Sequence, residues 1–286
     1  MNRRIRVRLW LNNLLKTAFM LSALFALGVL AVLLVQIVSQ SVGWLDWPFL
    51  TGKLSIQPER AGILGAIVGT LGMMIVAAPV TLVLGVCTAI YLEEYARDGK
   101  IKSFIQTNIA NLAGVPSVIF GLLGLTVFAR MFQLGASILA GGLTMSLLVL
   151  PIVVVSSQEA LRSVPQYLRE ASYGMGATKW QTIRRVVLPA SVPGMLTGFI
   201  LALSRAIGET APLVVLGIPV LLLPIPDSFM DTFTALPVQI YYWTLDAVLT
   251  PEYANLAAAA IVVLLVVLFA LNSAAIRIRN KFRKRY

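Results

Sequence analysis

The chain has 286 residues and a formal net charge of +11, yet 58% of its residues are hydrophobic and only 12% are charged. Its mean hydropathy is +0.87. A soluble domain carries about 25% charged residues, so this composition excludes a soluble globular protein and indicates a polytopic membrane protein. Histidine, the commonest general base and metal ligand, is absent. The single cysteine, Cys87, excludes an intrachain disulfide and a two-cysteine metal site.

Six long apolar stretches predict six membrane-spanning helices, because one span requires about 20 mostly apolar residues. The fold class is therefore all-α, with residues 1–286 forming a single transmembrane domain. Its core covers 62–275, and short tails flank it at 1–16 and 276–286. Pro116 removes a backbone donor from the third span and predicts a kink there. The predicted spans are 17–39, 62–91, 104–129, 137–158, 190–216 and 253–275.

The basic residues predict the orientation of the chain. Nineteen of the 23 Lys and Arg residues lie in the two tails and in the loops 93–103 and 159–189. A six-span chain places these four segments on one side of the membrane. Short cytoplasmic loops hold the excess of Lys and Arg, so we expect both termini to be cytoplasmic. The positive charge then sets the topology and contacts anionic lipid, and it does not indicate nucleic-acid binding.

The loop at 159–189 contains two helix-start signals. Ser163-Val-Pro-Gln166 and Thr178-Lys-Trp-Gln181 each fit a capping box. Gly174 and Gly176 supply a turn between them, because glycine tolerates positive φ. We therefore expect a short helix over about 164–174, a glycine turn, and a second helix that ends near Pro189. Such an exposed cytoplasmic element suits a cytoplasmic partner.

The same loop resembles the EAA motif of ABC importer permeases, whose pattern is E-A-A, three residues, G, nine residues and I-x-L-P. Two positions depart from this pattern, with Ser172 in place of the second Ala and Val186 in place of Ile. A helix-turn-helix loop of unrelated origin is the alternative interpretation. The matching residues are Glu170, Ala171, Gly176, Leu188 and Pro189.

The resemblance implies the type I ABC importer permease fold, with this loop as the coupling helix that docks in a groove of the ATP-binding subunit. Gly176 would then permit the turn, and Glu170 and Ala171 would lie close to that partner. The chain contains no GxxxxGK[ST] loop, so it is not expected to be an enzyme or to bind ATP by that route. The resemblance assigns ATP and Mg²⁺ to the partner ATPase, and leaves this chain without a cofactor or a metal.

Two further runs narrow the family. Asn111-Leu-Ala-Gly-Val-Pro-Ser-Val-Ile-Phe-Gly121 and Ser204-Arg-Ala-Ile-Gly-Glu-Thr-Ala-Pro-Leu213 resemble the phosphate-specific ABC importer permeases. The ending of the second run is closer to the A-type subunit than to its C-type partner. The resemblance implies half of a pathway for inorganic phosphate across the bacterial inner membrane. It also implies two ATPase subunits, a second homologous permease and an external phosphate-binding protein as partners.

Arg205 and Glu209 form the only ionisable pair predicted within a span. Each charge costs about 2.5–3.5 kcal/mol at a helix centre, so both should face protein or a water-filled cavity. At a spacing of four residues they share one helix face and neutralise each other. One interpretation is a purely structural ion pair. The other, which the resemblance favours, is that Arg205 lends positive charge to the anion path while Glu209 restrains it.

Other functions remain open from the sequence. Within the transporter class, the alternative is an importer permease for sulfate, molybdate or another solute. From a different class, the chain fits a membrane sensor or scaffold that keeps the loop and transports nothing. A stand-alone channel is disfavoured, because the cytoplasmic loop would then have no purpose.

Overall fold

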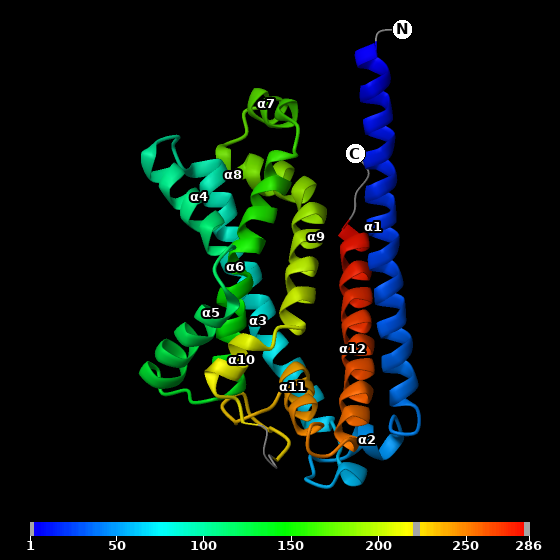
Figure 1. The fold of residues 1–286 in the computed structure, drawn as a ribbon. Coiled ribbons are helices and arrows are strands. Elements are labelled where there is room, and N and C mark those ends of the chain that lie inside the picture. The colour runs from blue at the N-terminus through cyan, green and yellow to red at the C-terminus, as the bar shows by residue number, and fades with distance from the viewer. Residues whose placement is uncertain (1–2, 220–223, 283–286) are drawn as a thin grey trace.

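The computed structural model describes residues 3–219 and 224–282, and this part of the chain is almost entirely helical (Figure 1). Among the described residues, five helices are long and apolar enough to span a membrane, and the number is six if one bent pair is taken as a single span. The predicted all-α fold class is therefore confirmed. The long helices are α1 (Arg3–Ser41), α3 (Leu64–Ile90), α6 (Ile138–Arg162), α9 (Leu188–Ile207) and α12 (Glu252–Phe282).

Shorter elements connect and extend these helices. Three of them are π-helical turns, whose backbone hydrogen bonds span five residues in place of the four of an α-helix. The π-helical elements are η2 (Tyr91–Tyr95), η3 (Gly124–Met131) and η4 (Ile183–Val187). The other short elements are α2 (Trp47–Thr51), η1 (Pro58–Arg60), α4 (Lys100–Leu112), α5 (Ser117–Leu123), α7 (Gln166–Gly174), α8 (Lys179–Thr182), α10 (Ala211–Leu216) and α11 (Leu236–Asp246).

The third predicted span is not one helix. Residues 104–129 were expected to be continuous with a kink, but α4 and α5–η3 meet at an angle of 104°. Pro116 is the N-cap of α5, and the residue before a proline is pushed away from helical geometry. Gly114 lies in the same break. The helix therefore stops at Leu112 and starts again at Ser117 in a new direction.

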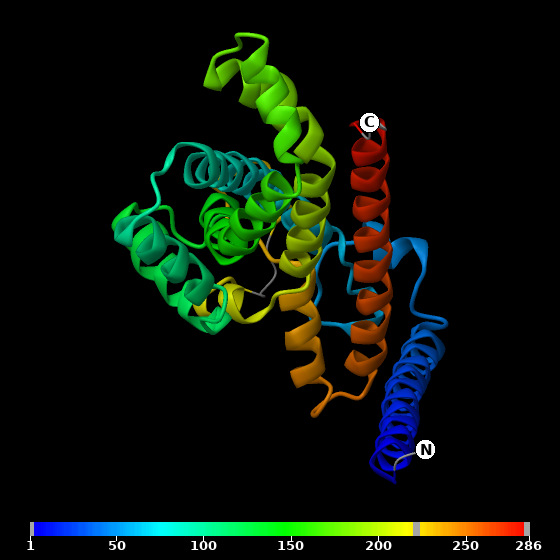
Figure 2. The same cartoon turned by 90° about the horizontal axis from the view of Figure 1, so that it is seen from above.

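Helix α6 lies at the centre of the described bundle, with α3 on one side and α9 on the other (Figures 1 and 2). Small residues let the backbones approach closely at lipid depth. A Cβ on Gly142 of α6 would lie 2.6 Å from the Cβ of Val76 on α3, so only glycine fits this contact. Helix α12 packs against α9 and α11, and α1 packs along the outside of α12.

The fifth predicted span and the segment that follows it also differ from the prediction. The predicted helix 190–216 divides into α9, a break at 208–210, and α10. Segment 217–252 contains five prolines, a composition that predicts a loop, which could pack on the bundle or receive an external partner. It forms α11, whose Trp243 is buried, and it also buries Phe233 completely. This segment therefore packs on the end of the bundle that lies opposite α7 (Figure 1).

The predicted tails do not form separate segments. The described part of the first tail is the start of α1, and α12 continues past residue 276 to Phe282. The remaining tail residues, 1–2 and 283–286, lie outside the described residues.

Candidate functional site

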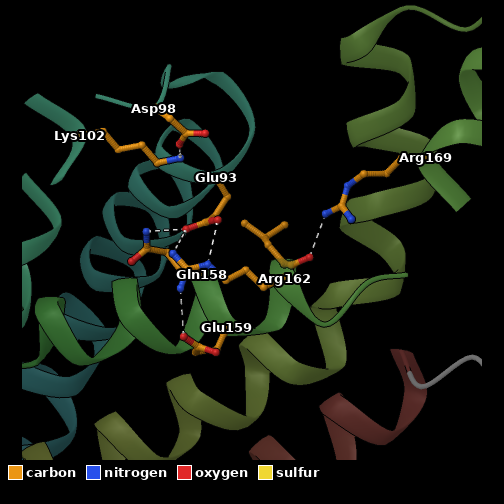
Figure 3. Close-up of polar contacts among 8 residues, drawn as sticks. Glu93, Asp98, Lys102, Gln158, Glu159, Arg162 and Arg169 are labelled. Atoms are coloured by element: carbon orange, nitrogen blue, oxygen red, sulfur yellow. Dashed lines mark hydrogen bonds and ion pairs between the residues drawn. The ribbon is translucent and has the colours of Figure 1, made fainter. Parts of the chain in front are cut away.

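A polar cluster lies where the end of α3 meets the end of α6 (Figure 3). Glu93 in η2 accepts hydrogen bonds from the side chains of two residues on α6. Gln158 Nε2 donates to Glu93 Oε1 at 2.9 Å, and Arg162 donates to both carboxylate oxygens at 2.6 and 3.0 Å. Arg162 also pairs with Glu159 at 3.3 Å. A bidentate arginine–carboxylate pair fixes geometry as well as charge, so the ends of α3 and α6 are held in one arrangement.

Arg169 of α7 connects the following loop to both helices. Its Nη2 lies 3.1 Å from Glu94 Oε1. The same guanidinium donates to the backbone oxygens of Leu161 and Val164, at 2.9 and 2.7 Å. These carbonyls belong to the end of α6 and its exit, where helix oxygens lack intrahelical partners. The Arg169 and Glu94 side chains are only 16% and 8% exposed. Arg169 therefore anchors α7 to the ends of α3 and α6.

The π turn η2 is what allows two adjacent carboxylates to serve two different helices. Its wide turn is closed by the hydrogen bond from Ala96 N to Tyr91 O at 2.8 Å. Glu93 then contacts α6, while Glu94 contacts α7. A polar cavity of about 410 Å³ lies beside these pairs. Sequence reasoning missed Glu93, Glu94 and Gln158, because polar side chains at the end of a span are typical of an ordinary solvated helix end.

The outward face of α7 carries two of the predicted coupling residues. Tyr167, Glu170 and Ala171 are exposed, and their spacing places them on one helix face. Gly176 has φ of +81°, so the predicted glycine turn is confirmed. Met175 beside it is 89% exposed. The loop thus presents an acidic residue among apolar and aromatic side chains.

One of the two predicted capping boxes is present. Thr178 Oγ1 accepts from Gln181 N, and the Gln181 side chain accepts from Thr178 N at 2.9 Å. Ser163 does not cap α7, because its hydroxyl donates to Ala160 O at 2.7 Å and ends α6 instead. The N-cap of α7 is Pro165.

Ser172, one of the two departures from the EAA pattern, makes a side-chain hydrogen bond. Its hydroxyl lies 2.9 Å from that of Thr182, a residue that is fully buried. An alanine would lose this hydrogen bond between α7 and α8. Lys179 of α8 adds a second link, with its ammonium 5.2 Å from the ring centroid of Tyr95 in η2.

The sequence predicted that the second helix of the loop ends near Pro189, and this prediction is wrong. Helical structure continues from Lys179 to Ile207 over 29 residues. Proline lacks the N–H that an α-helix would use here. The π turn η4 precedes it, and Leu188 N bonds to Ile183 O. Leu188 and Pro189 are thus half-buried in a membrane helix, away from the exposed face of α7.

Arg205 and Glu209 form the predicted ion pair, with 3.0 Å between Arg205 Nε and Glu209 Oε1. They do not share a helix face, because α9 ends at Ile207 and Glu209 lies in the break before α10. The Arg205 side chain is 53% exposed and the Glu209 side chain is 19% exposed. About half of the Arg205 side chain is therefore exposed, while Glu209 restrains the guanidinium from one side.

The two runs that narrowed the family pack against each other. A Cβ on Gly121 of α5 would lie 2.7 Å from Pro212 O at the start of α10. The break that holds Glu209 is thus supported by the helix that follows the 104° bend. Arg205 and the loop lie at opposite ends of one continuous helix, because Lys179–Ile207 begins in the loop and contains Arg205 in its last turn.

These features define an integral membrane permease of an ABC importer. The chain belongs to the family described as the binding-protein-dependent transport system inner membrane component, whose model matches residues 81–284. Permease subunits of this family are not catalytic. The family match and the long apolar helices make the chain a multi-pass protein of the inner membrane.

Some relatives are named as phosphate transport permeases, and another as a probable ABC transporter permease. The phosphate transport system permease protein PstA 1 of Mycobacterium tuberculosis is 34% identical over 282 residues, which cover 94% of this chain and 88% of the relative. PstA of Mycobacterium leprae is 36% identical over 249 residues, or 85% and 80% of the two chains. A probable ABC transporter permease of Bacillus subtilis, YqgI, is 33% identical over 213 residues, or 74% and 71%.

Solved structures support the fold alone, because their sequence identities are low. The methionine ABC transporter MetNI, in an inward-facing conformation, matches with a TM-score of 0.62 at 18% identity, over 78% of this chain and 96% of that chain. A bacterial ABC transporter involved in alginate import matches with a TM-score of 0.59 at 17% identity, over 97% and 100%. The predicted type I importer permease fold is confirmed.

Proposed function

We propose that this chain forms half of a translocation pathway for inorganic phosphate, in a complex with a second, homologous permease. Two ATPase subunits act on the loop at 159–189, and an external phosphate-binding protein delivers the ion. Both termini lie in the cytoplasm. Support comes from the mycobacterial relatives, which are named phosphate transport permeases and align over most of this chain.

The observation that carries the proposal is the Arg205–Glu209 pair at the end of α9. One guanidinium N–H is used by Glu209, so other N–H groups of the planar fork are available to phosphate oxygens. Charge-assisted hydrogen bonds to an anion are strong, and Arg205 alone would hold phosphate too long. The carboxylate of Glu209 competes for the same guanidinium and weakens the site, which permits release.

The helix Lys179–Ile207 supports a mechanism of coupling. Movement of α7, driven by the ATPase, is passed along this helix to Arg205 and through Arg169 to the ends of α3 and α6. Glu170, Ala171 and Gly176 form the contact with the ATPase, whereas Leu188 and Pro189 transmit its motion within the membrane. ATP shifts access between the two sides of the membrane because it binds one conformation better than the other.

The test is phosphate uptake by an Arg205→Gln variant in cells that lack the native chain. We expect uptake to fall to background, because each charge-assisted hydrogen bond lost is worth about tenfold or more in binding. Arg130→Gln is the matched control, since Arg130 is an exposed arginine at the end of η3. It should retain uptake.

The outcome that contradicts the proposal is normal phosphate uptake by Arg205→Gln at wild-type membrane abundance. Parallel assays with labelled sulfate and molybdate test the substrate. Arg205-dependent uptake of either anion without phosphate uptake would overturn the phosphate assignment. Loss of signalling with intact uptake, after deletion of the chain, would identify a sensor instead.

A further inference from the structure

An apolar groove of about 580 Å³ lies between α3, α9 and α12. Its walls are almost entirely apolar. Its lining includes Leu71 and Ile75 from α3, Leu203 from α9, and Ala275 from α12. Ile75 is an exposed large apolar side chain. The groove therefore offers a long hydrophobic surface to an occupant from the bilayer.

One polar side chain, Asn272 of α12, lines this groove. Its Oδ1 accepts a hydrogen bond of 2.7 Å from Ser204 Oγ on α9. Among the described residues no hydrogen-bond acceptor is found for its Nδ2 group. An unsatisfied amide at membrane depth is costly, since no water replaces the missing partner. The occupant of the groove should therefore bring a hydrogen-bond acceptor.

Arg279 continues the same face of α12 toward the C-terminal end of the helix. It stands seven residues after Asn272, about 10 Å along the axis. Its Nη1 donates to Thr197 Oγ1 of α9 at 3.3 Å, so the guanidinium lies between two of the helices that line the groove. A further N–H donates to the exposed Asn280 at 3.3 Å. With five donors, Arg279 retains capacity for an anion at this end.

We propose that the groove binds one anionic phospholipid. The acyl chain covers the apolar walls, an ester carbonyl accepts from Asn272, and the phosphate pairs with Arg279. Basic pockets between helices on the cytoplasmic side recognise anionic headgroups, and guanidinium groups bind phosphate oxygens strongly. The leaflet rests on the orientation proposed above. Because Ser204 precedes Arg205 in α9, this lipid holds the helix that carries the pathway arginine.

The test uses the assembled complex in nanodiscs of phosphatidylcholine with phosphatidylglycerol that carries a photoreactive acyl chain. We expect labelling within 71–79, 200–207 and 271–278. Both Arg279→Gln and Asn272→Leu should reduce labelling by about tenfold, because each removes a strong contact. Arg277→Gln is the matched control, since Arg277 lies on the same helix but off this face, and it should label normally.

Two results overturn the inference. Equal labelling by photoreactive phosphatidylcholine, insensitive to Arg279→Gln, indicates bulk lipid only. A groove that stays unlabelled in the assembled complex indicates that the second permease fills it. Ala275→Leu, which narrows the groove and keeps both polar groups, guards against misfolding and should also reduce labelling. Phosphate uptake is measured separately, so loss of labelling with intact uptake leaves the proposed function standing.

Discussion

Arg169 is the residue on which the position of α7 depends. Its guanidinium contacts Glu94 and also two backbone oxygens at the exit of α6. Removing the guanidinium leaves all three acceptors without this donor, whereas removing the Glu94 charge leaves the two backbone contacts in place. The two substitutions should therefore differ, although they break the same ion pair.

We expect Arg169→Gln to destabilise the folded chain by about 2–4 kcal/mol, since it breaks a mostly buried pair and orphans backbone acceptors. Glu94→Gln should cost about half as much. Thermal unfolding in detergent measures stability, and phosphate-stimulated ATP hydrolysis by the assembled complex measures coupling. We expect coupling to fall in the same order.

Equal effects of the two substitutions would contradict this prediction, because they would mean that the backbone contacts of Arg169 contribute nothing to stability or coupling. Arg184→Gln serves as a control for loss of positive charge in the same loop, since Arg184 is exposed. It should leave both stability and coupling near wild type.

For single residues, the sequence predicts the partners of charges in apolar surroundings but not the partners of charges at helix ends. Arg205 and Glu209 stand out because they interrupt an apolar stretch, and their ion pair is confirmed. Glu93 and Glu94 lie where a span meets water, and nothing in their spacing indicates that a π turn points them at different helices. The same limit applies to Ser163. Its sequence pattern predicts an N-cap of the next helix, but its hydroxyl instead hydrogen-bonds at the C-terminal end of α6.

At the scale of elements, hydrophobic length predicted the spans better than local signals predicted their ends. The bend at Pro116 was expected only as a kink, since sequence gives the missing donor but not the angle of 104°. Pro189 was expected to end a helix, but η4 widens the preceding turn and the helix continues. Helix α11 was missed because the prolines of segment 217–252, including Pro237 at the start of the helix, are typical of loops.

The turn between α7 and α8 yields a matched test at two neighbouring glycines. Gly176 has φ of +81°, whereas Gly174 is the last residue of α7 and has open space around it. We expect Gly176→Val to cost about 1–2 kcal/mol locally, because a side chain is strained at positive φ. The strain should displace α7 and lower phosphate-stimulated ATP hydrolysis in the complex.

Gly174→Val is the control, because it adds the same side chain in a helical conformation with no nearby atoms to meet. It should retain most of the coupled ATP hydrolysis. If both variants remain coupled and still copurify with the ATPase, the loop 159–189 is not the coupling element.

Several short elements and the ends of α1 and α12 gather at two opposite ends of the helical bundle (Figure 1). Helix α7 and the terminal ends of α1 and α12 lie at one end, and α2 and α11 lie at the other (Figure 1). The basic residues predict that the first end is cytoplasmic. Two nearly fully exposed side chains mark these ends, with Met175 beside α7 at 89% and Leu249 after α11 at 88%.

Cysteine accessibility tests this orientation directly. In a Cys87→Ser background, which removes the only native thiol, Met175→Cys and Leu249→Cys each supply one exposed thiol. A membrane-impermeant maleimide should label Leu249→Cys in intact spheroplasts and Met175→Cys only after permeabilisation. The Cys87→Ser parent should remain unlabelled and retain uptake. Labelling of Met175→Cys from outside would invert the orientation and remove the ATPase from reach of α7, because the loop 159–189 would then face away from ATP.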